Sequence, residues 1–493
     1  MRMSSISQRQ IWSQRLQQAV RGKLEGTALS AFNPNVDVVV HLDNASIQKM
    51  LAGNPDLNWE QIDSIDIAEL PALRTREEFV AVLMDRFGQG KSILLVRESK
   101  GLTSWFEEHF PKRYDKLGGQ AGIMATQLAS LGARSVLYSP ILSKRQAEVL
   151  HPHVVFPVVD GGSITLQTAR QAARASDPTR SPWVFEYGKD ETYVFGHRRI
   201  TTPRANRVIA IPKDEGLGMN FTPEFTPYLA EFARHIDVGM VAGYHLGGPN
   251  PDDREIMRRY FQESLQALRT LRQANPRLKL HLEYVPMKDK EMEKEMLVTM
   301  SQGVDSFGIN EVEIGHVLTL MGADELAEAI SKNERAYVLY QGGLKLLRKL
   351  RLERIHIHNL GYYVVVLKKP YFCTPERVRQ ACLFGSIVNA QRALTGECAL
   401  IQDIPEIGEI SLSEEGLQQL VDCADELAKE QPQAATQLRH SGYAELDDHY
   451  LVVVPTHVIP NPVVTVGMGD TISSSVYAME VVGLLAQADN VAK

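Results

Sequence analysis

The chain has 493 residues, of which 44% are hydrophobic and 23% charged, and its formal net charge is −7. This composition is typical of a globular protein of roughly two or three domains, and the negative charge argues against a nucleic-acid partner. No stretch approaches the roughly 18 consecutive apolar residues of a membrane-spanning helix, and the basic N-terminus lacks the apolar core of a signal peptide. The four cysteines include no Cys-x-x-Cys pair, so we expect free thiols in a cytoplasmic protein.

Apolar runs of strand length alternate with helical patterns along most of the chain. The runs that predict strands are 36–42, 92–96, 135–138, 154–159, 208–211, 238–242, 279–285, 306–309, 354–358, 362–367, 450–455 and 463–466. The patterns that predict helices include 121–131, 251–274, 288–302, 324–350, 376–393, 414–431 and 471–486. This alternation predicts an α/β protein with a large, mainly parallel sheet flanked by helices.

Two regions interrupt the alternation with turns and closely spaced strands, at 86–119 and 181–212. They predict a smaller inserted domain that acts as a lid. We expect the lid to contain residues 36–44, 86–119 and 181–212. We expect the large domain to contain residues 1–35, 45–85, 120–180 and 213–493. A lid near the carboxyl ends of the strands would exclude water from a ligand site there.

The expected strand 463–466 leads into Gly467-Met468-Gly469-Asp470, and a helical pattern follows. Glycines at such a turn let the backbone approach a ligand, and the first amides of the helix form an anion site. Asp470 would place a general base beside that anion, which is what phosphoryl transfer to an alcohol requires. The other interpretation is an ordinary glycine and aspartate turn.

Two segments have the chemistry to bind a sugar. Asn35 and Asp37 would share one face of the expected strand 36–42 and could bond to hydroxyl groups. Gly118 and Gly119 precede a helical pattern, where small residues let a polyol approach backbone amides. A turn before a strand and a tight loop are the plainer interpretations of these two segments.

Oxygen ligands occur at the ends of two expected strands. Asn310 and Glu313 follow the strand 306–309, and such ligands suit magnesium, usually through waters. His281 and Glu283 would share one face of the strand 279–285. Helix N-capping by Asn310 and a buried core histidine at 281 are the alternatives.

Cations in the expected lid could clamp phosphate groups. Arg204 and Arg207 lie in Pro-Arg-Ala-Asn-Arg, and Lys189 follows a nearby glycine. Guanidinium groups bind phosphate through paired hydrogen bonds. Solvated surface arginines are the alternative.

Taken in order, these motifs resemble the ADP-dependent sugar kinases, the archaeal-type phosphofructokinases and glucokinases of the ribokinase-like superfamily. The resemblance runs from about residue 31 to the C-terminus. It implies a lid over a nucleotide-binding domain and transfer of the β-phosphoryl group of Mg-ADP to a sugar hydroxyl, with release of AMP. The residues that it assigns are the base Asp470, the anion hole of Gly467, Met468 and Gly469, the Mg²⁺ site of Asn310, Glu313 and Glu283, and the sugar contacts Asn35, Asp37, Gly118 and Gly119. The segment Asn359-Leu360-Gly361-Tyr362 is similar to the family's adenine pocket, so Asn359, Gly361, Tyr362 and Thr465 are expected to contact the nucleotide.

The acceptor sugar depends on one departure from the family pattern. Family glucokinases carry a glutamate shortly after a Gly-Lys pair, whereas Gly90-Lys91 here is followed by no acid until Glu98. This favours fructose 6-phosphate, with Lys189 and Arg204 or Arg207 near its phosphate, and leaves glucose as a secondary acceptor. Whether Arg204 contacts ADP or the sugar phosphate stays open. The alternatives are an ADP-dependent glucokinase, an ATP-dependent ribokinase-like kinase and a sugar sensor without catalysis, and the sequence predicts no oligomeric state.

Overall fold

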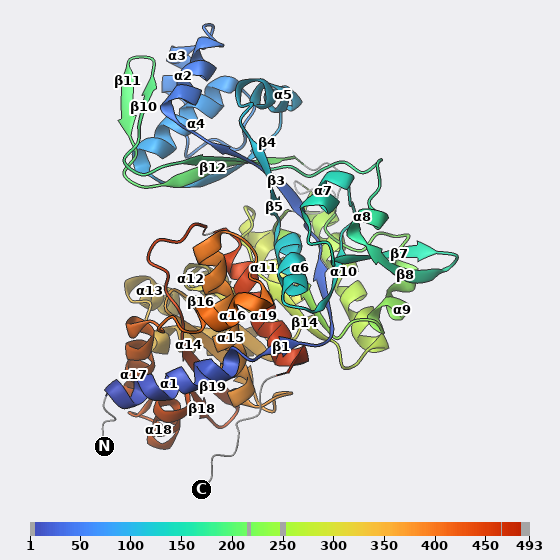
Figure 1. The fold of residues 1–493 in the computed structure, drawn as a ribbon, viewed down its shortest axis with the longest axis vertical. Coiled ribbons are helices and arrows are strands. Elements are labelled where there is room, and N and C mark those ends of the chain that lie inside the picture. Colours follow the sequence, from blue (N-terminus) through green and yellow to red (C-terminus); the bar gives the residue numbers. More distant parts are fainter. Residues whose placement is uncertain (1–4, 214–217, 247–252, 465, 485–493) are drawn as a thin grey trace.

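The structure is a computed structural model that describes residues 5–213, 218–246, 253–464 and 466–484 (Figure 1). The chain forms two α/β parts of unequal size, each with its own sheet and its own hydrophobic core. Figure 1 shows the small part at the top and the large part, which contains the helices α1 (Ser5–Ala19) and α19 (Met468–Val482), below it. The expected α/β class is therefore confirmed.

The large part is built on an eleven-stranded sheet with the order β18-β19-β17-β16-β15-β14-β13-β2-β6-β7-β8. All neighbours from β16 across to β7 are parallel, and antiparallel pairs lie at both edges. The central strands are buried on both faces, which explains why they read as apolar runs. The strands are β2 (Thr27–Ala31), β6 (Arg134–Tyr138), β7 (Val155–Asp160), β8 (Ser163–Thr168), β13 (Val238–Val241), β14 (Lys279–Glu283), β15 (Ser306–Asn310), β16 (Arg354–Asn359), β17 (Tyr362–Lys368), β18 (Tyr443–Glu445) and β19 (His449–Pro455).

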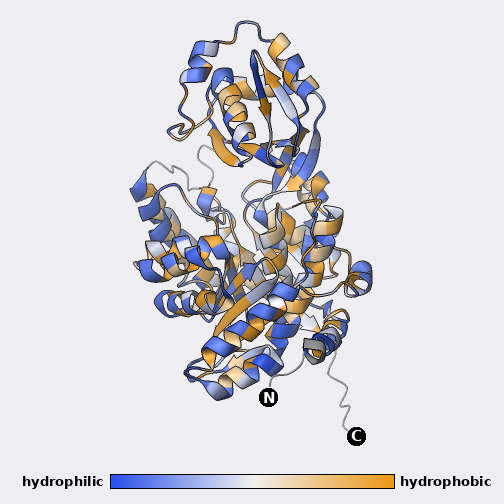
Figure 2. Ribbon diagram, turned by 90° about the vertical axis from the view of Figure 1, so that its left-hand side faces the viewer, coloured by the Kyte–Doolittle hydropathy of each residue, from blue (hydrophilic) through white to orange (hydrophobic). Residues whose placement is uncertain are grey.

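Three helices of the large part pack side by side and position the site described below. The helix α19 (Met468–Val482) lies between α6 (Gln120–Ser130) and α15 (Pro375–Thr395), and it crosses β13 to β16. The other helices of this part are α1 (Ser5–Ala19), α7 (Lys144–Val149), α8 (Ala169–Ala172), α9 (Leu229–Ala233), α10 (Arg254–Ala274), α11 (Lys290–Met300), α12 (Glu311–Leu320), α13 (Asp324–Lys332), α14 (Ala336–Leu350), α16 (Ile404–Ile407), α17 (Glu414–Leu427) and α18 (Pro432–Ser441). Figure 2 shows hydrophilic and hydrophobic residues alternating along many of them, as expected for helices with one face in a core. None of the helices within the described ranges is long and apolar enough to cross a membrane.

The small part contains a five-stranded sheet with the order β4-β12-β9-β3-β5. Its strands are β3 (Asn35–His41), β4 (Ile93–Arg97), β5 (Tyr114–Gly118), β9 (Trp183–Tyr187) and β12 (Asn206–Pro212), and the hairpin of β10 (Thr192–Phe195) and β11 (Arg198–Thr201) extends beside it. Its helices are α2 (Asn44–Ala52), α3 (Trp59–Ser64), α4 (Arg76–Gln89) and α5 (Lys100–His109). On β12, Val208 and Ala210 belong to the core under these helices. Side chains alternate along a strand, so Arg207 lies on the opposite face.

Three expectations about the elements differ from the structure. Residues 45–85, expected in the large domain, form most of α2 to α4, whose apolar residues pack with Phe185 in the core of the small part. The expected helix 324–350 is two helices, because residues 333–335 break it. The described residues of 463–466 are not a strand, and the amide of Val463 instead bonds to the carbonyl of Ala393 at the end of α15 at 2.7 Å.

Candidate active site

The glycine motif forms the N-terminus of α19. Gly467 is the N-cap, its φ of 72° is left-handed, and a Cβ there would lie 2.6 Å from Ile123 Cδ1 on α6, so the position requires glycine. The backbone N–H groups of Met468, Gly469 and Asp470 belong to the first turn, where a helix has no intrahelical acceptors. Together with the dipole of a 15-residue helix, these groups are suited to bind an anion.

Asp470 is partly exposed at this N-terminus. Burial raises the pKa of its carboxyl group to about 7, the nearby charge of Glu283 adds to the rise, and Arg392 opposes it. The side chain of Gln120 on α6 is a hydrogen-bond partner of Asp470. A carboxyl group with a pKa near neutrality is suited to accept a proton as a general base.

A buried carboxylate lies beneath the first turn of α19. Glu283, at the end of β14, has its Oε2 atom 3.2 Å from His281 Nε2 and its Oε1 atom 3.6 Å from His358 Nε2. Burial disfavours the charged form of Glu283, but the hydrogen bond with His281 and the nearby His358 ring outweigh this effect and lower its pKa to about 2. A Cβ on Gly469 would lie only 3.3 Å from Glu283 Oε1, so this carboxylate touches the anion site. The structure thus brings the His-x-Glu pair and the glycine motif together.

Asn310 and Glu313 form a capping box at the start of α12. Asn310 Oδ1 accepts from the amides of Val312 at 3.0 Å and Glu313 at 2.8 Å, and Glu313 Oε2 accepts from the amide of Asn310 at 3.0 Å. The side-chain oxygen of Asn310 therefore caps the N-terminus of α12, as the N-capping interpretation predicted. Burial raises the pKa of Glu313 to about 7.

The oxygen atoms of Glu313 and Glu283 can be compared with the ligands that Mg²⁺ requires. Among the described residues, no group of three or more His, Cys, Asp and Glu side chains is arranged to hold a metal. Mg²⁺ usually takes one or two protein carboxylates, waters and substrate phosphates rather than a full protein cage. Glu313 and Glu283 therefore fit a site in which waters and phosphate oxygens provide most of the ligands.

The expected sugar residues lie where the small sheet meets α6. The strands β3 and β5 are antiparallel, with Asn35 opposite Gly118. A Cβ on Gly118 would lie 2.1 Å from Asp37 Oδ1, so only glycine lets the Asp37 carboxylate lie over it. Gly119 then begins α6 with a φ of 74°. Asn35 Oδ1 is buried and has no hydrogen-bond partner among the residues that the structure describes. Burial raises the pKa of Asp37 to about 7 against the opposing charges of Lys116, Arg180 and Arg207.

The three expected phosphate-binding cations do not converge. Arg207 lies near Asp37 on the face of the small sheet away from its helices. Arg204 Nε instead donates to the carbonyl of Gly90 at 2.7 Å. The Lys189 side chain is 65% exposed and lies 3.7 Å from the Asp190 carboxylate. Of the three, Arg207 is the one that lies near the expected sugar residue Asp37.

The expected nucleotide residues build the turn between β16 and β17. Asn359 Nδ2 donates to the Tyr362 hydroxyl at 2.8 Å, and Asn359 Oδ1 accepts from the amide of Leu360 at 2.6 Å. Gly361 has a φ of 93° in this turn. Contact of this turn with a nucleotide stays a prediction, and Thr465 lies outside the described residues.

Four residues near the site were not predicted from the sequence, namely Gln120, Arg180, His358 and Arg392. Gln120 directly follows the Gly118-Gly119 pair, and this position is the sequence feature that could have indicated its place in the site. Arg180, His358 and Arg392 reach the site from segments whose patterns show only a loop, a strand and a helix. Their side chains act on Asp37, Glu283 and Asp470 through the fold.

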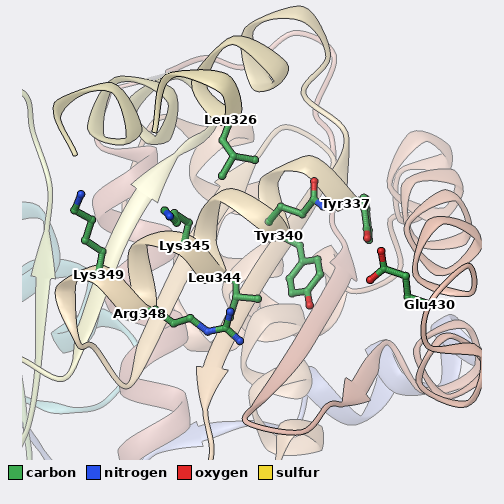
Figure 3. Close-up of a pocket in the computed structure, with 9 residues that line it drawn as sticks. Leu326, Tyr337, Tyr340, Leu344, Lys345, Arg348, Lys349 and Glu430 are labelled. Atoms are coloured by element: carbon green, nitrogen blue, oxygen red, sulfur yellow. The ribbon is translucent and has the colours of Figure 1, made fainter. Parts of the chain in front are cut away.

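Figure 3 shows a different cavity, of about 630 Å³, against α14. Its lining includes Tyr337, Tyr340 and the cation Arg348, but none of the residues discussed above. Arg348 forms an ion pair with Asp448 at 2.9 Å, and Lys349 Nζ donates to a backbone carbonyl. None of the residues expected to bind the nucleotide or the sugar lines this cavity, so it is a weaker candidate for the active site.

Comparison with known proteins identifies the family. The model of the conserved region of ADP-specific phosphofructokinase and glucokinase matches residues 27–479. The chain belongs to this family. It is 31% identical to the ADP-specific phosphofructokinase of Thermococcus kodakarensis over 91% of this chain and 94% of that protein. The resemblance drawn from the sequence motifs is thereby confirmed.

Other members of the family extend the comparison. The ADP-dependent glucose/glucosamine kinase of Pyrococcus abyssi is 27% identical over 93% of this chain and 95% of that protein. The solved structure of the last common ancestor of ADP-dependent phosphofructokinases from Methanosarcinales has a TM-score of 0.83, with 27% identity, 99% coverage of this chain and 100% of that chain. A solved complex of an ADP-dependent kinase with fructose-6-phosphate and ADPβS has a TM-score of 0.80 and 27% identity, covering 98% of this chain and 99% of that chain. Both sugar specificities therefore occur among the relatives.

Proposed function

We propose that this chain is an ADP-dependent 6-phosphofructokinase, which transfers the β-phosphoryl group of ADP to fructose 6-phosphate and releases fructose 1,6-bisphosphate and AMP. The observation that carries the proposal is Asp470, a carboxyl group with a pKa of about 7 in the anion-binding first turn of α19. Such a group can take a proton from an alcohol next to a bound phosphate. The curated relatives named as ADP-specific phosphofructokinases support the same reaction.

Each residue has a step in the proposed mechanism. Asn35 and Asp37 orient the sugar through its hydroxyl groups, beside the backbone of Gly118 and Gly119. Asp470 then removes the proton from the acceptor hydroxyl as that oxygen attacks the β-phosphorus, and AMP leaves with the bridging oxygen. The amides of the Gly467 turn stabilise the charge that develops on the transferred group.

The nucleotide and its metal complete the proposed site. Asn359, Gly361, Tyr362 and Thr465 are the proposed surroundings of the adenosine. Glu313, supported by Asn310 and Glu283, would hold Mg²⁺ through waters, and the ion would neutralise charge on the phosphate oxygens. Because ADP and sugar phosphates are cytoplasmic metabolites, we place the enzyme in the cytoplasm.

The acceptor is proposed from two features of the small part. No acidic residue occurs between Lys91 and Glu98, where family glucokinases tend to carry a sugar-contacting glutamate. Arg207 supplies a cation near Asp37, with Lys189 and Arg204 further away as secondary candidates. Both features favour a phosphorylated sugar over glucose. A second, weaker glucokinase activity is proposed because a glucose/glucosamine kinase is among the relatives.

A matrix of donors and acceptors tests the proposal. The purified chain is assayed with ADP or ATP against fructose 6-phosphate or glucose, in the presence of Mg²⁺. We expect the highest kcat/KM for ADP with fructose 6-phosphate, and a lower value for ADP with glucose. Preference for ATP would overturn the donor, a preference for glucose would overturn the acceptor, and no transfer in any combination would favour a sensor.

A further inference from the structure

A buried arginine lies directly behind the opening of α19. Arg392 is in the last turn of α15, and its side chain is 4% exposed. Its Nη2 atom donates to the carbonyl of Val466 at 3.2 Å, and its Nη1 atom donates to Cys398 Sγ at 3.5 Å. A Cβ on Gly467 would lie 3.1 Å from Arg392 Nη2. The guanidinium group therefore touches the turn that begins α19.

Two other buried arginines of the chain have a carboxylate partner, unlike Arg392. Arg354 pairs with Glu480 at 2.6 Å, and Arg379, on the same helix as Arg392, pairs with Glu376 at 2.8 Å. The hydrogen bonds of Arg392 within the described ranges go to a carbonyl and a thiol, neither of which carries a negative charge. Burying a guanidinium charge with no carboxylate hydrogen-bonded to it is costly. Residues that break a stability rule in this way are expected mainly at functional sites.

The charge of Arg392 lies where it can act on the first turn of α19. The C-terminal end of α15 meets the N-terminal end of α19, so the charge lies near the free amides of Met468, Gly469 and Asp470. It also acts on Asp470, whose pKa it lowers against the effect of burial. A fixed positive charge behind main-chain donors strengthens their attraction for a phosphate group in surroundings of low polarity.

We propose that Arg392 is a positioning residue of the phosphoryl-transfer site. It holds the Gly467 turn in shape through the Val466 carbonyl, and it supplies a permanent positive charge behind the amides that receive the β-phosphate. This inference rests on the proposed function. Because a charge acts most strongly at short range, Arg392 should favour ADP, which carries the β-phosphate, over AMP, which lacks it.

Three variants test the inference, namely Arg392→Met, Arg392→Lys and the matched control Arg379→Met from the same helix. For Arg392→Met we expect kcat to fall by roughly 30-fold, less than the roughly 100- to 1000-fold loss of one oxyanion donor, because Arg392 acts through the turn. Calorimetry should show a larger loss of affinity for ADP than for AMP. The Tm should change little, because losing the hydrogen bond to the Val466 carbonyl opposes the gain from removing a buried charge. Arg392→Lys, which keeps the charge, should recover about tenfold of the lost kcat.

The control separates this role from a structural one. Arg379 Nη1 donates to the Ser441 carbonyl at 2.8 Å, far along the helix from Gly467, so Arg379→Met should lower the Tm while kcat changes by less than about threefold. The inference is wrong if Arg392→Met keeps its kcat and its preference for ADP over AMP. It is also wrong if the loss of kcat in Arg392→Met comes with a fall in Tm and Arg392→Lys recovers none of the lost kcat. Should Arg392→Met fail to fold, Arg392→Gln takes its place with the same criteria.

The same experiments distinguish the inference from the proposed function. If the wild-type chain transfers no phosphoryl group from ADP to any sugar, the proposed function fails. The calorimetric comparison of ADP with AMP in the wild-type and variant proteins still tests Arg392 in that case. If the wild-type chain is active and the variants behave like it, the inference about Arg392 fails alone.

Discussion

Replacing Asp470 with asparagine should remove catalysis while leaving the fold intact. Asparagine has nearly the same shape but cannot accept the proton of the acceptor hydroxyl. General bases contribute about 10²- to 10⁴-fold to rates, so we expect kcat for ADP and fructose 6-phosphate to fall at least about 100-fold. ADP should still bind, because the amides of the Gly467 turn are unchanged.

The same substitution should increase stability in a way that depends on pH. The pKa of Asp470 rises from 3.8 to about 7 in the folded chain. At about 1.4 kcal/mol for each pKa unit, the charged form destabilises the fold by up to about 4 kcal/mol, and partial exposure of the side chain reduces this figure. Below the unfolded pKa both states are protonated and the effect vanishes. It grows as pH rises between the unfolded and folded pKa values and is complete above about pH 7.

Asp470→Asn should therefore gain more Tm over the wild type at pH 8 than at pH 5. The assay is a thermal unfolding scan of both proteins at several pH values, beside steady-state kinetics and calorimetry with ADP. An equal Tm difference at both pH values would refute the burial of a charged group at this position. Turnover above roughly one tenth of the wild-type value would refute its role as the base.

The remaining predictions concern the metal, the acceptor and the turn. Glu313→Gln keeps the capping box but should raise the Mg²⁺ concentration for half-maximal activity about tenfold, whereas the neighbouring control Glu311→Gln should not; equal Mg²⁺ curves would contradict the assignment. Arg207→Met should raise KM for fructose 6-phosphate about tenfold and leave KM for glucose within about threefold, and a parallel rise for both sugars would show that Arg207 does not meet the phosphate. Gly467→Ala should lower both Tm and kcat, because φ is left-handed there and Ile123 leaves no room; a variant with wild-type Tm and kcat would disprove this strain.

Sequence patterns predicted the large sheet well because of where its strands lie. Strands buried on both faces read as continuous apolar runs, so β13 to β16 were recognisable without any partner. The segment 45–85 was assigned to the wrong part because an amphipathic helix reveals its apolar face but not the sheet that the face covers. The run 463–466 read as a strand, yet Val463 is 68% exposed and its amide bonds to the end of α15.

The candidate site was predictable where the chemistry is local. The glycines and the aspartate of the Gly467 turn are adjacent in sequence, so their geometry followed from the motif. Asn310 left two interpretations open, and its two bonds to backbone amides identify it as an N-cap. Arg392 is different, because it is far from Asp470 in sequence and meets it only through the packing of α15 against α19. Which cations lie near the site thus depends on tertiary contacts, and a local sequence motif does not reveal these.

The central claim is that the β-phosphoryl group of ADP moves to the acceptor hydroxyl of fructose 6-phosphate. The most direct measurement follows ADP labelled with radioactive phosphorus in the β position. We predict that the label appears in fructose 1,6-bisphosphate, with one AMP released for each labelled sugar. Label recovered as inorganic phosphate, or no AMP formed beside the labelled sugar, would contradict the account.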